Sequence, residues 1–181
     1  RKLADLSKKA SSLKDLLTRI DREEEKIKKL GTPGAKPTPV AVRKTPKVDP
    51  KDIVTSGLPV AGSIQTAFGQ KNAYGVTNKG LEIGARPGST VTSPLGGVVK
   101  FAGPFKSYRN IVIIEHYDNT MGLIGGLRDI TVQTGSNVRS GEPIGVVGGH
   151  GGESSMIYFE IRKGGQQIDP RKHLAKFSKR S

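Results

Sequence analysis

The chain has 181 residues, of which 34% are hydrophobic, and this content is low for a single continuous globular core. Its 30 lysines and arginines exceed its 16 acidic residues and give a net charge of +14, so a polyanionic partner or surface has to be considered. The excess is shared equally between residues 1–56 and 57–181, which argues against a nucleic-acid-binding protein with one basic stripe. The absence of cysteine excludes disulfide scaffolds, cysteine-ligated zinc and thiol nucleophiles.

Neither a membrane span nor an export signal is present in the sequence. No apolar run approaches the roughly 18 residues that a spanning helix requires, so membrane insertion is not predicted. The chain starts at Arg1 without methionine or a signal-like segment. We therefore expect a fragment of an exported protein, with the export signal upstream of Arg1.

Residues 1–30 have the pattern of one amphipathic helix. Apolar residues recur at alternating steps of three and four, the a/d spacing of a coiled coil, at Leu3, Leu6, Ala10, Leu13, Leu17, Ile20 and Ile27. No proline or glycine interrupts the pattern before Gly31, which is a suitable C-terminal stop. The pattern predicts the end of a coiled coil, and a helix docked on its own domain is the alternative.

Residues 31–56 have the composition of a linker. Prolines recur through the segment without helical or strand periodicity, at Pro33, Pro37, Pro39, Pro46 and Pro50. Such an extended segment is long enough to reach any face of the domain that follows.

Residues 57–178 are predicted to form a mainly β domain. Short β-branched runs alternate with glycine, proline and asparagine, and the expected strands are 63–68, 81–85, 90–91, 97–101, 111–115, 121–125, 144–147 and 156–161. Strand starts spaced by roughly 8–12 residues, without helices between them, favour an antiparallel β-sandwich or partly closed barrel. Asp169 and Pro170, followed by His173, Leu174 and Phe177, predict a short closing helix.

Short motifs follow one another through this domain in a characteristic order. They occupy residues 58–62, 78–85, 88–91, 96–99, 111–116, 138–145 and 157–162. Each motif is weak alone, but their order resembles the lysostaphin/LytM-type zinc endopeptidases of peptidoglycan over residues 58–174. The resemblance implies a LytM-like fold of the duplicated hybrid motif type.

Active members of that family hold zinc through a His-x-Gly-x-Asp segment and the second histidine of a His-x-His-Phe-Glu segment. The resemblance places Asn78 and Glu82 at the histidine and aspartate of the first segment. Met156 and Tyr158 replace both histidines of the second segment, and Gly126 replaces a further family histidine. Because only Glu82 could still reach a metal, we expect no metal, no cofactor and no catalytic residue, and therefore a non-enzymatic homologue.

The sequence retains three histidines elsewhere. His116 ends an apolar run and is interpreted as structural, while His150 lies in a glycine-rich turn and is interpreted as solvated. His173 belongs to the C-terminal segment. None of the three is expected to restore a zinc site.

The family groove would be lined by Lys79, Glu82, Tyr108, Ile124, Tyr158 and Arg162. Such an apolar and aromatic floor between charges suits protein recognition, because tyrosine and arginine are frequent hot spots of interfaces. The alternative is that Ile124 and Tyr158 fill the former metal site and only stabilise the sheet.

A degenerate LytM domain after a coiled coil resembles the EnvC-type murein hydrolase activators. Residues 158–162 match their Tyr-Phe-Glu-Ile-Arg segment, and Lys79 and Gly80 match their Lys-Gly motif. The resemblance implies a periplasmic, non-catalytic protein that activates N-acetylmuramoyl-L-alanine amidases through the groove during septal wall splitting. It also implies an FtsEX-like division complex as the partner of the coiled coil, and departures at Glu82 and Gly126 leave the amidase open.

Three further hypotheses concern regulation and function. The helix or the linker could lie across the groove in the resting protein, which would make the chain autoinhibited. The domain could instead be a peptidoglycan-binding module, because positive charge favours an anionic wall. A residual zinc endopeptidase that uses Glu82 is the remaining alternative, and nucleic-acid binding is not expected.

Overall fold

The computed structural model describes residues 15–19, 22, 25, 57–72, 74–105, 108–149 and 155–178. The chain divides into two compact units, Arg1–Lys47 and Val48–Ser181. In the first unit, residues 15–19, Arg22 and Glu25 are helical. The rest of the predicted coiled coil, and the predicted linker, lie outside the described residues.

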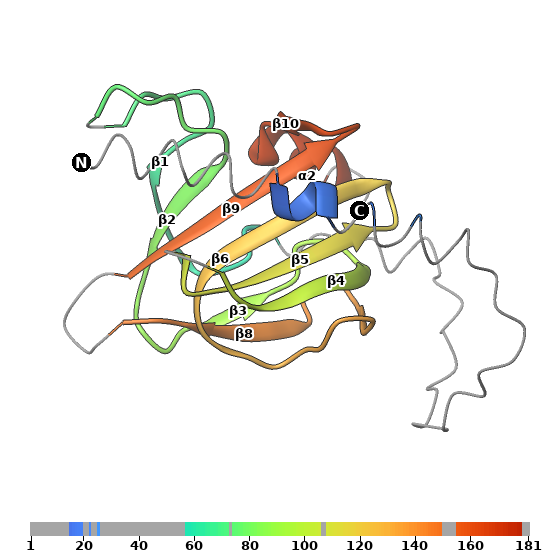
Figure 1. Ribbon diagram of the computed structural model, residues 1–181. Helices are drawn as coiled ribbons and strands as arrows, with labels where there is room; N and C mark the ends of the chain where they lie inside the picture. The colour runs from blue at the N-terminus through green and yellow to red at the C-terminus, as the bar shows by residue number, and fades with distance from the viewer. Residues whose placement is uncertain are drawn as a thin grey trace, which may run out of the picture. The chain divides into compact units, whose positions relative to one another are not determined.

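The second unit is built on antiparallel strands (Figure 1). The strands are β1 (Gly62–Thr66), β2 (Leu81–Ala85), β3 (Thr90–Thr92), β4 (Gly97–Pro104), β5 (Asn110–His116), β6 (Thr120–Ile130), β7 (Asn137–Val138), β8 (Pro143–Val147), β9 (Ser155–Lys163) and β10 (Gln166–Ile168). One helix, α2 (Pro170–Ser178), follows them. Within the described residues, no helix is long and apolar enough to cross a membrane.

The strand order of the main sheet is β1-β2-β9-β6-β5-β4-β7. β10 is added to β9 as a hairpin, and β8 pairs with both β3 and β6, so that β3 and β8 lie off the main path. Every pairing is antiparallel. The sequence-based expectation of a mainly antiparallel β domain is therefore confirmed, and the sheet is not closed into a barrel.

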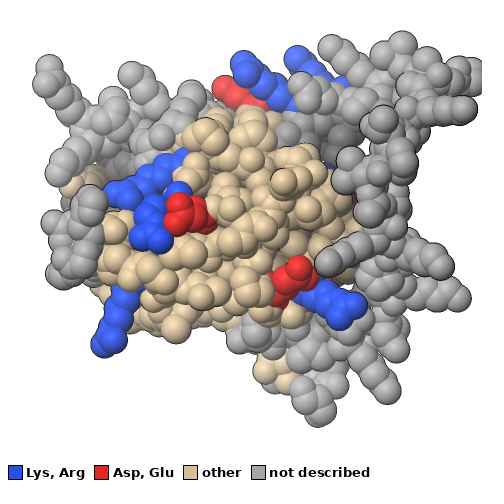
Figure 2. All heavy atoms as spheres, turned by 90° about the horizontal axis from the view of Figure 1, so that it is seen from below, with Lys and Arg blue, Asp and Glu red and all other residues tan. Residues whose placement is uncertain are grey.

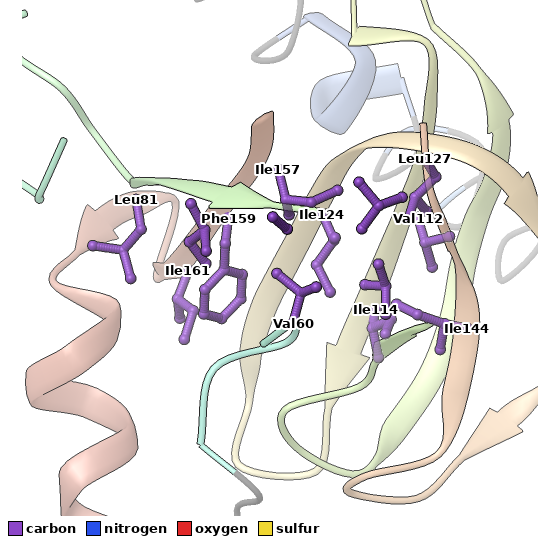
Figure 3. Close-up of a cluster of buried hydrophobic side chains, with 14 of the residues drawn as sticks. Val60, Leu81, Val112, Ile114, Ile124, Leu127, Ile144, Ile157, Phe159 and Ile161 are labelled. Carbon is purple, nitrogen blue, oxygen red and sulfur yellow. The ribbon is translucent and has the colours of Figure 1, made fainter. Parts of the chain in front are cut away.

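The hydrophobic core lies between the central strands of the sheet and the β3–β8 pair (Figure 3). Phe159 of β9 and Ile124 of β6 are paired across the two strands, and both side chains belong to this core. Val91 of β3 and Ile144 of β8 close it from the other side. Alternation of apolar and polar residues along the strands, as on β2, directs one set of side chains into this core.

The predicted strands agree with the structure in position, and two short strands were missed. β2 has the predicted bounds, whereas β7 and β10 have two and three residues and no apolar alternation that a sequence pattern could detect. The predicted closing helix is confirmed as α2, whose Leu174 packs into the core.

A side-chain contact between His173 of α2 and Asp118 joins the helix to the turn between β5 and β6, and a second buried histidine, His116, lies nearby in the sequence. The His173 Nε2 atom lies 2.6 Å from Asp118 Oδ2, and this pair ties the helix to the turn. His116 is buried, with its Nδ1 atom 3.3 Å from the Gly96 carbonyl oxygen, and its Nε2 atom has no partner among the described residues. Burial lowers the pKa of His116 to about 4. The structural interpretation of His116 is consistent with this placement.

Candidate functional site

Two neighbouring strands, β2 and β9, carry the candidate site on the face that points away from the core, together with Tyr108, which lies just before β5 (Asn110–His116). Glu82 of β2 lies between two core residues and directly opposite Tyr158 of β9, and residues paired in this way share a face. Tyr158, Glu160 and Arg162 follow one another on this face because they are two residues apart in one strand. We call Glu82, Tyr108, Tyr158, Glu160 and Arg162 the site face.

A buried carboxylate connects the polar groups of the site face. The Tyr158 hydroxyl donates a hydrogen bond to Glu160 Oε2 over 2.6 Å. Arg162 Nε donates to the other carboxylate oxygen, Oε1, and forms an ion pair with it. The Glu160 side chain is only 2% exposed and that of Arg162 is 10% exposed. Such charged groups are tolerated in a buried position because they are paired and hydrogen-bonded.

Two tyrosine rings pack against each other above two glycines. The ring centroids of Tyr108 and Tyr158 are 5.7 Å apart at an interplanar angle of 52°. A Cβ atom added to Gly125 would lie 3.2 Å from Tyr108 Cδ1, and one added to Gly80 would lie 3.0 Å from the Tyr158 hydroxyl oxygen. Glycine at both positions therefore gives the rings their room.

The environment keeps both tyrosines protonated. Burial, followed by the negative charge of Glu160 and the hydrogen bond to it, raises the pKa of Tyr158 well above its usual value. Burial, followed by the charges of Glu160 and Glu82, also raises the pKa of Tyr108. Because the Tyr158 phenol is neutral and donates its hydrogen bond to Glu160, this side chain is a poor replacement for a zinc-binding histidine.

The other positions that the resemblance assigns to zinc ligands do not fit the ion either. Asn78 Nδ2 donates to the backbone carbonyl oxygens of Thr66 at 3.2 Å and Gly80 at 2.9 Å, so this side chain fastens the loop before β2. Gly126 has φ +96°, and a Cβ atom there would lie 2.4 Å from the Met156 carbonyl oxygen, which leaves no room for a histidine. Across the described residues, no group of three histidine, cysteine, aspartate or glutamate side chains could hold a metal ion.

The structure brings most of the predicted groove residues together and corrects one. Ile124 is 1% exposed and packs in the hydrophobic core, so its predicted place in the groove is wrong (Figure 3). Lys79 is exposed, one residue before the Gly80 backbone against which the Tyr158 ring lies. Met156 is 46% exposed at the start of β9, on the same side of the strand as Tyr158. His150 lies outside the described residues.

Glu160 is the functional candidate that sequence reasoning missed. The Tyr-x-Glu-x-Arg spacing of residues 158–162, inside a predicted strand, places the three side chains on one face. That spacing was the available signal, but the interpretation considered Tyr158 and Arg162 only.

Surface charge does not indicate a nucleic-acid interface. On the face drawn in Figure 2, the described lysines and arginines occur singly or beside acidic residues, and uncharged residues cover most of the described surface. Among the described residues, Arg128 Nε and Asp129 Oδ2 are 2.7 Å apart, so this arginine is paired with an acidic residue. A continuous basic stripe, which would bind a phosphate backbone, is not present on this described face.

The chain matches one known protein family and resembles named proteins. The model of "Peptidase family M23" matches residues 76–170. "Murein hydrolase activator EnvC" of Escherichia coli (strain K12) is 35% identical over 119 residues, which are 65% of this chain and 28% of that protein. "Murein hydrolase activator NlpD" of the same strain is 29% identical over 123 residues, which are 67% of this chain and 32% of that protein. The chain thus spans about a third of the length of these relatives.

Solved structures share the fold. Lysostaphin from Staphylococcus simulans superposes with a TM-score of 0.60 at 16% identity, over 72% of this chain and 56% of that one. A zinc-containing peptidase from Vibrio cholerae gives a TM-score of 0.57 at 23% identity, over 65% of this chain and 39% of that one. These likenesses confirm the expected LytM-like fold.

Proposed function

The chain belongs to peptidase family M23, and from this premise we propose that it is a non-catalytic activator of murein hydrolases. Two relatives named murein hydrolase activators support this role. The observation that carries the proposal is the hydrogen bond from Tyr158 to Glu160, because the resemblance assigns the position of Tyr158 to a zinc-binding histidine. A polar network that is already satisfied within the protein offers a contact surface but no ligand for a catalytic metal.

We propose amidases as the activated hydrolases. The resemblance to EnvC-type proteins supports N-acetylmuramoyl-L-alanine amidases, activated in the periplasm during septal wall splitting, with an FtsEX-like complex bound by the coiled coil. The site face offers two tyrosines and one arginine, which are residue types enriched in interface hot spots. Activation then requires that the chain bind the active state of the amidase more tightly than the inactive state.

An autoinhibited resting state is a further part of this proposal. The predicted linker, residues 31–56, is long enough to bring itself or the predicted helix across the site face. Deletion of residues 1–56 is then expected to increase amidase binding. Equal affinity of the deleted and the full chain for the amidase would contradict autoinhibition.

Dye release from labelled peptidoglycan tests the proposal. The assay compares the full chain with added zinc, the amidase alone, and the two proteins together. We expect release above the level of the amidase alone only in the mixture. Release by the chain alone would identify an endopeptidase, and a mixture equal to the amidase alone would contradict activation.

A peptidoglycan-binding module is the second candidate function, because the net charge of +14 favours binding to an anionic wall. Sedimentation with purified sacculi at increasing salt distinguishes the two functions, since wall binding requires no amidase. Salt-sensitive sedimentation together with the absence of stimulation in the dye-release assay would favour the wall-binding module.

A further inference from the structure

The Glu160 carboxylate accepts hydrogen bonds from two other members of the site face, Tyr158 and Arg162. It is 2% exposed, and each of its oxygens accepts one hydrogen bond, Oε2 from Tyr158 and Oε1 from Arg162. A carboxylate in this position is shielded from water, so its hydrogen bonds and ion pair are stronger than those at the surface. These contacts therefore restrict the conformations of the Tyr158 and Arg162 side chains, which lie two residues before and after Glu160 in β9.

These bonds also fix which groups remain available to a partner. Because the Tyr158 hydroxyl proton points to Glu160, the hydroxyl oxygen can offer only its lone pairs to another molecule. Because Nε of Arg162 is occupied, its two terminal Nη groups remain as donors, and no second acceptor contacts this guanidinium among the described residues. The site face thus presents an acceptor at Tyr158 and donors at Arg162.

We propose that Glu160 is a positioning residue that sets the orientation and the hydrogen-bond polarity of Tyr158 and Arg162 for a protein partner. The complementary partner surface carries an N–H or O–H donor opposite Tyr158 and a carboxylate or carbonyl oxygen opposite Arg162. This inference rests on the proposed function, because it assigns the chemistry of the surface through which the hydrolase would be bound.

The wild-type chain gives the first test, which requires no hydrolase. In ¹⁵N-resolved NMR spectra, the Arg162 Nε–H proton is expected to exchange with water much more slowly than that of Arg128, whose ion pair with Asp129 is exposed. An Arg162→Lys variant identifies the signal by its loss. Equal exchange rates for the two arginines would overturn the inference whatever the function of the protein.

The second test changes the polarity of the network without removing its shape. Glu160→Gln retains an acceptor for Arg162 but places an amide donor beside Tyr158, so the tyrosine proton turns outward. The concentration of the chain that gives half-maximal stimulation of the amidase is expected to rise by about tenfold or more. The matched control, Asp129→Asn, removes the carboxylate charge from the exposed Arg128–Asp129 ion pair and is expected to leave stimulation unchanged.

A double-mutant cycle separates positioning from general stability. If Glu160 acts through the hydroxyl of Tyr158, Glu160→Gln should have a much smaller effect in a Tyr158→Phe background than in the wild type. Equal effects in both backgrounds would overturn the inference. Thermal unfolding and the NMR spectrum establish that each variant is folded.

The outcomes distinguish this inference from the proposed function. Full stimulation by folded Glu160→Gln would overturn the positioning role while leaving the activator proposal intact. Failure of the wild type to stimulate any amidase would contradict the activator proposal, and the exchange rates of Arg162 and Arg128 would then still decide the positioning role. If Glu160→Gln does not fold, the wild-type exchange measurement decides it in the same way.

Discussion

The two faces of β2, β9 and β6 are built from the same strands but serve different purposes. On the core face, Phe159 and Ile124 pack with other apolar side chains and exclude water. On the opposite face, one residue away along β9, Tyr158, Glu160 and Arg162 satisfy each other through hydrogen bonds. The period of two in a β-strand therefore lets one segment specify both the fold and the contact surface that we propose.

Alternation along β9 places Tyr158 on the face opposite the core residues Ile157 and Phe159. At Gly126, by contrast, an added Cβ atom would lie 3.4 Å from Cδ1 of the core residue Ile157. Tyr158, at a position that the resemblance assigns to a zinc ligand, is compatible with this strand pairing, in which it lies opposite Glu82 and Gly125.

The largest expected effect on stability comes from the core face. Phe159→Ala should lower the free energy of unfolding by about 3–5 kcal/mol, because it removes a fully buried ring and leaves a cavity. Tyr158→Ala, one residue away, should cost about 2 kcal/mol or less, because its ring is partly exposed. Urea unfolding measures both values, and equal losses would contradict the division of labour between the faces.

Gly126 of β6, which the resemblance assigns to a family histidine position, is expected to reject any side chain. Gly126→Ala should lower the free energy of unfolding by about 2–3 kcal/mol, because it combines a positive φ with a Cβ atom 2.4 Å from the Met156 carbonyl oxygen. Gly135→Ala is the control, since its φ is +90° and no atom lies within 4 Å of the added Cβ. A loss at Gly126 no greater than that at Gly135 would show that the strand can move aside.

Acid is expected to weaken the fold through His116. The folded protein holds this imidazole neutral with a pKa of about 4, whereas the unfolded chain binds the proton near 6.5, so stability falls as the pH decreases through this window. The loss between pH 7 and pH 5 should be about 2 kcal/mol.

Urea unfolding at several pH values measures this loss. The wild type is compared with a variant at His116 in which its charged neighbours, Asp118 and His173, are retained. His116→Gln should be less stable at pH 7 and show a flatter dependence on pH over the same window. An equally steep dependence in this variant would assign the effect to other groups.

The smallest expected effect concerns an exposed ion pair on β4 and β5. Lys100 Nζ lies 2.7 Å from Glu115 Oε2, but the glutamate side chain is 47% exposed. Glu115→Gln should therefore change the free energy of unfolding by about 0.5 kcal/mol or less. A loss above about 2 kcal/mol would show that ion pairs at this surface are as strongly coupled as the buried Glu160–Arg162 pair.

Sequence reasoning predicted the strands well where apolar and polar residues alternate, as on β2, where the bounds agree. It could not detect β7, whose two residues contain no repeat, because such a strand is specified by its neighbours in space. The domain limits proposed for residues 1–56 remain predictions.

The candidate site was less predictable than the fold. Alternation indicates which residues of a strand share a face, but it does not indicate which face is buried when neighbouring residues are all uncharged. This is the case around Ile124, whose neighbours in β6 are leucine and glycine. Ile124 was therefore placed in the groove although it packs in the core. The role of Glu160 depends on two contacts of its carboxylate that only the folded strand shows.

The central claim is that the site face is used for partner activation, and a pair of tyrosine variants tests it most directly. Dye release by the amidase is measured with the wild-type chain, Tyr158→Ala and Tyr117→Ala, after each has been shown to be folded. Tyr117 is 38% exposed outside the site face and serves as the control. We predict that Tyr117→Ala stimulates like the wild type and that Tyr158→Ala loses about tenfold or more. Full stimulation by folded Tyr158→Ala would contradict the account.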